Sequence, residues 1–174
     1  MKSNPRRFRR RNSLRLIGYD YSNPGFYHVT VVITGRHSLL GEIENEAFLP
    51  SQAGLTVIDA WNDLPTFYPW ICIDEFVIMS DHLHGIIEIA DVPERRSLSI
   101  AMRRFKSLSA SAVNEALNQT GQVWQRGFFD RVIRSDRDLD ATRAYIRNNP
   151  LKGFLASELG YPGYQATDSR RVTA

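Results

Sequence analysis

Two histidines and one feature of their spacing make the first candidate for chemistry in this 174-residue chain. His82 and His84 are two positions apart in a segment rich in isoleucine, and residues two apart on a strand project from one face of a sheet. Leu83 and Gly85 would then face the core. Two neutral imidazoles side by side offer lone pairs to a metal ion. A pair of surface histidines gives the same pattern, so the motif alone predicts only part of a site.

A tyrosine and an asparagine near the end of the chain form the second candidate. Leu139, Thr142 and Ile146 have helical spacing and are expected to face the core. Tyr145 is rotated by about 100° from Ile146, so it lies at the rim of the buried stripe. Asn149 follows at i+4 and should lie on the same face one turn later. A half-buried core tyrosine and a helix-terminal asparagine would fit the same pattern.

Alternating strands and helices must position these residues. Strands are predicted at 26–33, 70–79, 82–90 and 123–133, and helices at 55–64, 98–117 and 137–148. Pro65 and Pro150 are expected to end helices, and residues 35–50 to form a loop. The order β-α-β-β-α-β-α predicts an α+β fold with a ferredoxin-like antiparallel sheet and helices packed on it. We expect a flexible basic arm at 1–17, one domain at 18–152 and an irregular tail at 153–174.

The charges are strongly segregated along the chain. The net charge is +3, but residues 1–17 carry +7, residues 18–94 carry −11 and residues 95–147 carry +6. Basic segments of this kind favour a nucleic-acid partner, because lysine and arginine release counterions from phosphates. Cys72 is the only cysteine, which excludes an intramolecular disulfide and favours a reducing compartment. No apolar run is long enough to cross a bilayer. The expected location is the cytoplasm, with no membrane partner.

Three segments in order carry a resemblance to a known family. Residues 79–87 (MSDHLHGII), 124–134 (WQRGFFDRVIR) and 145–152 (YIRNNPLK) resemble successive signatures of the REP-associated tyrosine transposases, which belong to the single-tyrosine His-hydrophobe-His (HUH) transposase superfamily. Residues 15–21 and the strand after them fit the same pattern, so the likeness spans about 14–152. Ser80 stands where proline is common in that family. His28 occupies a position that is often aromatic, and we expect it to serve packing.

The resemblance implies a metal-dependent DNA-cutting and -joining enzyme, a transposase. Carried over by position, it implies that His82, His84 and Asn149 hold Mg²⁺ or Mn²⁺ and that Tyr145 attacks DNA to form a 5′-phosphotyrosine intermediate. The implied substrate is single-stranded or hairpin DNA from repeats, and the implied location is the cytoplasm, in association with the nucleoid. Candidate DNA contacts are the basic and aromatic residues Arg103, Arg104, Lys106, Trp124, Arg126, Phe128, Arg131 and Arg134.

Other functions remain open from sequence. A domesticated, non-cleaving binder of structured nucleic acid could share the fold. A small metallohydrolase could combine the histidines with Asp81 or Glu88. A zinc-stabilised module is disfavoured, because one cysteine and one histidine pair do not complete a closed tetrahedral site. Whether the protein is a monomer or a homodimer is also left open.

Overall fold

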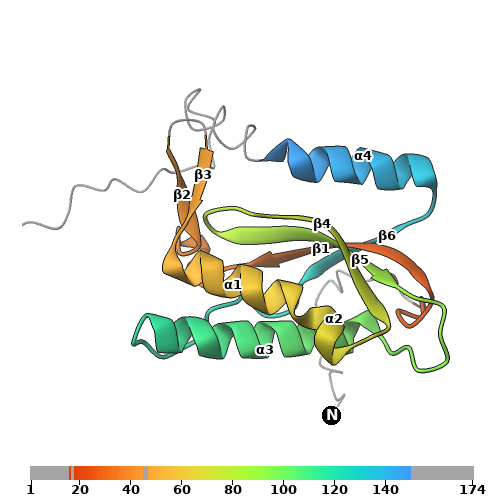
Figure 1. Cartoon of the computed structure of the whole chain (residues 1–174), viewed down its shortest axis with the longest axis horizontal. Coiled ribbons are helices and arrows are strands. Elements are labelled where there is room, and N and C mark those ends of the chain that lie inside the picture. The colour runs from red at the N-terminus through yellow and green to blue at the C-terminus, as the bar shows by residue number, and fades with distance from the viewer. Residues whose placement is uncertain (1–15, 17, 45–46, 150–174) are drawn as a thin grey trace, which may run out of the picture.

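A four-stranded antiparallel sheet forms the centre of the molecule (Figure 1). The computed structural model describes residues 16, 18–44 and 47–149. In spatial order the strands are β4 (Ile71–Ile78), β5 (His82–Ile89), β1 (Gly25–Val32) and β6 (Phe129–Ile133). Each pair of neighbours is antiparallel. This is the α+β, ferredoxin-like arrangement that the sequence predicted.

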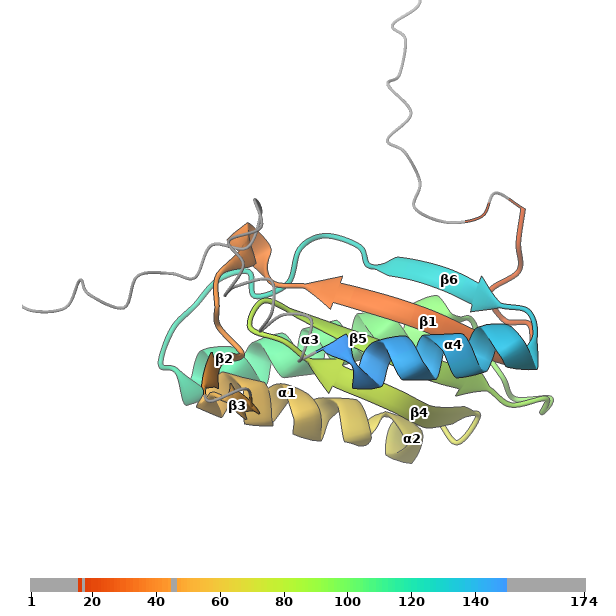
Figure 2. The same cartoon turned by 90° about the horizontal axis from the view of Figure 1, so that it is seen from above.

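Helices cover both faces of this sheet (Figure 2). α1 (Gln52–Asn62) and α3 (Leu98–Ala116) lie on one face, and α4 (Asp136–Arg147) lies on the other. In the described part of the chain, no helix is long and apolar enough to cross a membrane.

The main core lies between the sheet and the helices α1 and α3. Leu83 and Ile87 of β5 are fully buried there, as the period-two pattern predicted, and they pack with Trp61 of α1 and Phe105 of α3. The opposite face is covered more thinly. Ile86, Ile133, Leu139 and Ile146 form a small separate cluster between the sheet and α4. This second face is the one that carries His82 and His84.

Four short elements were not predicted. The expected loop at 35–50 contains a hairpin of β2 (Gly41–Glu44) and β3 (Ala47–Pro50), after a 3-10 turn, η1 (Thr34–Arg36). Strands of four residues give too few alternations for a period-two pattern to be recognised. The helix predicted to stop at Pro65 is followed directly by α2 (Leu64–Phe67), since proline in a first turn loses no hydrogen bond.

Two predicted boundaries were wrong for local reasons. α1 begins three residues before 55, because the Ser51 side chain caps it by accepting from the Gly54 amide at 3.1 Å. The strand predicted at 123–133 is regular only from Phe129. Trp124 makes an isolated bridge to Ile33, and Gly127 at φ 74° interrupts the extended chain between them. The predicted arm at 1–17 (except Leu16) and the predicted tail at 153–174 lie outside the described residues.

Candidate active site

The two histidines stand side by side at the start of β5. The ring centroids of His82 and His84 are 4.7 Å apart, and the ring planes cross at 84°. Both rings project from the face that α4 covers, on the same side as buried Ile86. The spacing in the sequence therefore placed the pair correctly on one face of a strand.

Each histidine is oriented by a second polar group. The Nδ1 of His82 lies 2.5 Å from Asp81 Oδ1, and Asp81 Oδ2 accepts from Arg36 at 3.1 Å. The Nδ1 of His84 lies 2.8 Å from the hydroxyl of Thr30, its cross-strand partner on β1. When Nδ1 carries the proton in such a bond, the Nε2 lone pair is left for another ligand. Hydrogen bonds of this kind are typical of the residues behind metal-binding histidines.

Burial favours the neutral form of the His84 ring. Burial lowers the pKa of His84 to about 3, with further lowering by the neighbouring His82 and His28. Burial would raise the pKa of Asp81, but the hydrogen bond and charge of His82, together with Arg36, outweigh it and hold that pKa below its ordinary value. At neutral pH Asp81 is thus a carboxylate, and His84 needs to lose no proton before it binds a cation.

The phenol ring of Tyr145 reaches this cluster from α4. Its centroid is 5.5 Å from that of His84 and 6.1 Å from that of His28, in edge-on contacts. The Tyr145 side chain is 39% exposed, so it combines contact with the histidines and access to solvent. Its position at the rim of the buried stripe agrees with the rotation derived from the sequence.

His28 also belongs to this cluster. Its ring lies 5.3 Å from that of His84, and its buried Nε2 has no hydrogen-bond partner. Burial, followed by the charge of Arg131, lowers its pKa to about 4. Sequence reasoning assigned His28 to packing. The available signal was its spacing of two from Thr30, which places both side chains on one face of β1 beside β5.

Asn149 lies one turn beyond Tyr145 and is only 8% exposed. Its amide nitrogen is buried without a hydrogen-bond partner. Rotation of a side-chain amide by 180° exchanges the positions of its oxygen and its nitrogen. The unpaired position can therefore offer either a donor or an acceptor to a bound partner. Across the described residues, no group of three or more His, Cys, Asp or Glu side chains could hold a metal ion. A metal site here would therefore need a different donor, such as this amide.

Two of the expected DNA contacts make hydrogen bonds within the protein, and one of them is buried. Trp124 is 3% exposed, and its indole N–H donates to Ser109 Oγ at 2.9 Å, so it is a core residue and cannot stack on a base. Arg131 donates to Asp138 at 2.5 Å and to Thr142 Oγ1 at 2.7 Å. The Arg131 side chain is nonetheless 51% exposed, so it stays a candidate for a phosphate contact.

Other basic candidates gather near one cavity. Arg103, Lys106 and Phe128 line a cavity of about 310 Å³ between α3 and the segment before β6. Lys106 donates to the carbonyl oxygens of Gln125 and Gly127, each at 2.5 Å, and burial lowers its pKa.

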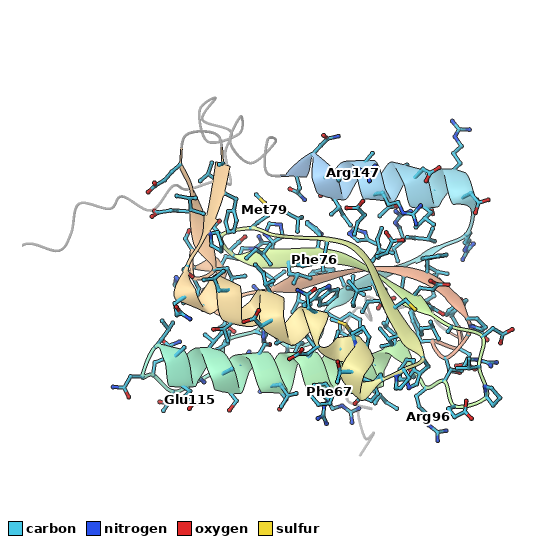
Figure 3. All side chains as sticks on the ribbon, viewed as in Figure 1. Phe67, Phe76, Met79, Arg96, Glu115 and Arg147 are labelled. Carbon is cyan, nitrogen blue, oxygen red and sulfur yellow. The ribbon has the colours of Figure 1, made fainter. Side chains whose placement is uncertain are left out.

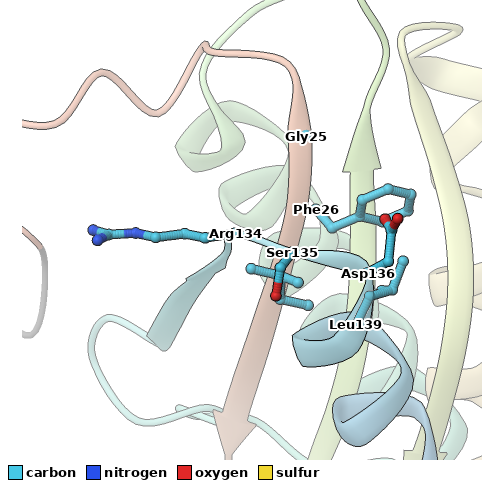
Figure 4. A pocket seen from close by; sticks show the side chains of 7 residues that line it. Gly25, Phe26, Arg134, Ser135, Asp136 and Leu139 are labelled. Atoms are coloured by element: carbon cyan, nitrogen blue, oxygen red, sulfur yellow. The ribbon is translucent and has the colours of Figure 1, made fainter.

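Three other arginines lie outside this cavity. Arg104 stacks over the Phe67 ring at 4.0 Å, and Arg126 is exposed on the turn that Lys106 holds. Arg134 borders a smaller cavity of about 200 Å³ at the start of α4, and its side chain points away from that cavity (Figure 4). These three side chains stay candidates for phosphate contacts.

Comparisons with known proteins assign the family. A family model described as "Transposase IS200 like" matches residues 69–149, which include both histidines, Tyr145 and Asn149. An uncharacterized protein of Haemophilus influenzae is 32% identical over 160 residues, covering 81% of this chain and 88% of that protein. The chain belongs to the IS200-like transposase family. IS200-like transposases are enzymes that cleave and rejoin DNA.

Two more relatives place the transposase within this family. A second Haemophilus influenzae protein, named "Putative REP-associated tyrosine transposase", is 25% identical over 152 residues, covering 82% of this chain and 80% of that one. A solved structure of a REP-associated tyrosine transposase bound to a REP hairpin superposes with a TM-score of 0.60 at 21% identity. The match covers 79% of this chain and 73% of the solved chain, and it supports the fold. The transposase thus has the resemblance expected from its three sequence segments.

Proposed function

We propose that this transposase cuts and rejoins single-stranded DNA beside a hairpin, with Tyr145 as the nucleophile. The observation that carries the proposal is the contact of the Tyr145 ring with His84, 5.5 Å between centroids, at a histidine pair already oriented by Asp81 and Thr30. The relative of known structure is bound to a REP hairpin, which makes a hairpin from genomic repeats the substrate to test first.

The reaction exchanges one ester for another. The Tyr145 phenol oxygen forms a bond to phosphorus while the bond from phosphorus to the 3′-oxygen breaks. The phenol proton passes to solvent, and the departing 3′-oxygen takes up a proton to become a hydroxyl. The product is a 5′-phosphotyrosine, and attack by a 3′-hydroxyl on that linkage rejoins the strand without a nucleoside triphosphate.

The chain fits a divalent cation at this place. His82 and His84 would ligate through Nε2, since each Nδ1 already has a partner, and Asn149, which is 8% exposed, would contribute the oxygen of its side-chain amide. A mixed nitrogen and oxygen set with open positions suits Mn²⁺ or Mg²⁺. Bound there, such an ion would neutralise charge on the scissile phosphate and on the departing oxygen.

We infer that the substrate strand reaches this site around one edge of the sheet. β6 is an edge strand, and its first residue, Phe129, pairs with Thr30, which in turn pairs with His84. Phe128, which lines the cavity together with Arg103 and Lys106, comes immediately before Phe129. We propose that Arg103 binds a phosphate and that the Phe128 ring stacks on a base in this cavity. The nucleotide that is cut then lies beyond the β6 edge, beside the histidines.

Capture of the covalent intermediate tests the proposal. The transposase is incubated with a labelled REP-type hairpin that carries a single-stranded flank, with Mn²⁺ or with EDTA, and adducts are resolved under denaturing conditions. We expect a metal-dependent adduct that Tyr145→Phe abolishes while hairpin affinity is retained. Tyr68→Phe is the matched control, because Tyr68 packs on Trp70 away from the histidines. An adduct of full yield in Tyr145→Phe refutes the assignment of the nucleophile.

The same assay separates the competing functions. His82→Ala and His84→Ala should lose the adduct and keep hairpin binding, because both rings would hold the metal and neither lines the cavity. Hairpin binding by the wild-type protein with no adduct under any metal would instead identify a non-cleaving binder. Hydrolysis of nucleotides or esters without an adduct would identify a metallohydrolase.

A further inference from the structure

Helix α4 is tied to the sheet by ion pairs on both of its flanks. On one flank, Arg143 binds Asp74 of β4 with contacts of 2.6–3.2 Å, and Arg147 binds Glu75 at 2.6 Å. On the other flank, Asp138 binds Arg131 of β6 at 2.5 Å. Figure 3 shows the side chains that fill the space between α4 and the sheet. The helix presents arginines toward β4 and an aspartate toward β6. Rotation of α4 about its own axis would therefore move these side chains away from their ion-pair partners.

The helix geometry connects these pairs to Tyr145. Taking Ile146 as the direction of the sheet, Arg147 is rotated by about 100° and Arg143 by about 60° to one side, whereas Tyr145 is rotated by about 100° to the other side. A roll of α4 that lifts the two arginines from β4 must therefore also change the height of the phenol above the histidines. The apolar cluster under α4 has four buried members, of which Leu139 and Ile146 come from the helix itself.

The acceptors on β4 stand at an irregularity of the strand. The pairing of β4 with β5 shifts register between Ile73 and Phe76, so Asp74 and Glu75 occupy a β-bulge. A bulge bends the strand and redirects its side chains. Hydrogen bonds from Arg143 lower the pKa of Asp74, and the same bonds raise the pKa of Arg143. The bidentate pair is thus charged at any pH at which the protein works.

We propose that Asp74–Arg143 and Glu75–Arg147 are positioning pairs that set the roll of α4 and hold Tyr145 beside His84. This inference rests on the proposed role of Tyr145 as nucleophile. It assigns a structural role to two arginines that flank the tyrosine in the sequence. None of the four residues contacts the reacting atoms. They act on the rate of attack through the position of Tyr145.

The test compares Arg143→Gln with Arg137→Gln. Arg137 is exposed on the same helix and is rotated by about 180° from Ile146, so its substitution removes an equal charge on the side away from the sheet. For Arg143→Gln we expect the single-turnover rate of adduct formation to fall roughly ten- to a hundred-fold, because a small misplacement of a nucleophile is costly. Its hairpin Kd should match that of Arg137→Gln.

A charge exchange then distinguishes an effect on the position of Tyr145 from a general loss of folding stability. Asp74→Arg combined with Arg143→Glu should recover much of the rate that each single variant loses. Hydrogen exchange gives a readout that needs no activity: amides in the last two turns of α4 should exchange faster in Arg143→Gln than in Arg137→Gln, with β5 unchanged. Equal rates and equal exchange in the two variants overturn the inference. A wild-type protein that forms no adduct, with the exchange difference present, refutes the proposed nucleophile and leaves the positioning of α4 standing.

Discussion

Substitution of Gly85 by alanine is expected to disturb the candidate active site from the opposite side of the sheet. Gly85 follows His84 on β5 and faces the core, where Trp61 is fully buried. A Cβ at Gly85 would lie 2.4 Å from Cζ2 and 3.0 Å from Cη2 of that indole. Carbon atoms in contact prefer about 3.5–4.0 Å, so either the ring or the strand must move by ~1 Å.

The indole has little room to move. It is packed edge-on against Phe105 with centroids 5.1 Å apart, in a core cluster whose members are closely packed. Overpacking of this kind costs about 1–3 kcal/mol, and the share of the displacement that β5 takes up also shifts His84. A shift of ~1 Å at a catalytic group lowers rates by about a hundred-fold. We therefore expect Gly85→Ala to lose both stability and adduct formation.

A double-mutant cycle in urea, with adduct rates measured in parallel, checks this reasoning. Trp61→Phe removes the benzo ring atoms that the new methyl group would meet, at its own cost in packing. Gly85→Ala should therefore be better tolerated in the Trp61→Phe background, with a coupling of about 0.5–3 kcal/mol. Unfolding free energies that simply add, or an unchanged urea midpoint for Gly85→Ala, would refute the steric argument.

Two further predictions concern the polar side of the sheet. Thr30→Val removes the hydroxyl beside His84 Nδ1 with little change in shape, and we expect Mn²⁺ affinity measured by calorimetry to fall about 10–100-fold, with Thr30→Ser close to wild type. An unchanged affinity in Thr30→Val would remove Thr30 from the support of the site. For His28, the folded pKa of about 4 lies below the ordinary 6.5, so the unfolded chain binds the proton first and stability falls as pH drops below 6.5. Between pH 8 and pH 5 in metal-free buffer, the unfolding free energy of His28→Phe should fall by up to about 2 kcal/mol less than that of the wild type. Parallel pH profiles of the unfolding free energy would contradict this.

The sequence predicted which face of the sheet carries the two histidines, and where Tyr145 lies on its helix, because these signals are local. The period of two in β5 put His82 and His84 on one side and Leu83 and Ile87 on the other, and both assignments are confirmed by burial. The rim position of Tyr145 followed from its rotation relative to Ile146. These inferences needed only the geometry of one strand and one helix.

Features that depend on the pairing of distant strands could not be predicted. The place of His28 in the cluster requires that β1 lies beside β5, and the hydrogen bonds of Arg131 require that α4 lies beside β6. Trp124 was taken as a candidate for stacking, but its burial depends on α3 supplying Ser109 as a hydrogen-bond acceptor. Side chains of arginine and tryptophan serve either role, and only tertiary contacts decide between them.

The unequal hydrophobic packing on the two faces of the sheet has a consequence for how the molecule opens. The apolar cluster under α4 is small, whereas α1 and α3 share an extensive core. Partial opening that frees α4 should then require much less free energy than global unfolding, since little apolar surface becomes hydrated. The tyrosine would leave and regain its place while the histidines stay fixed on an intact scaffold.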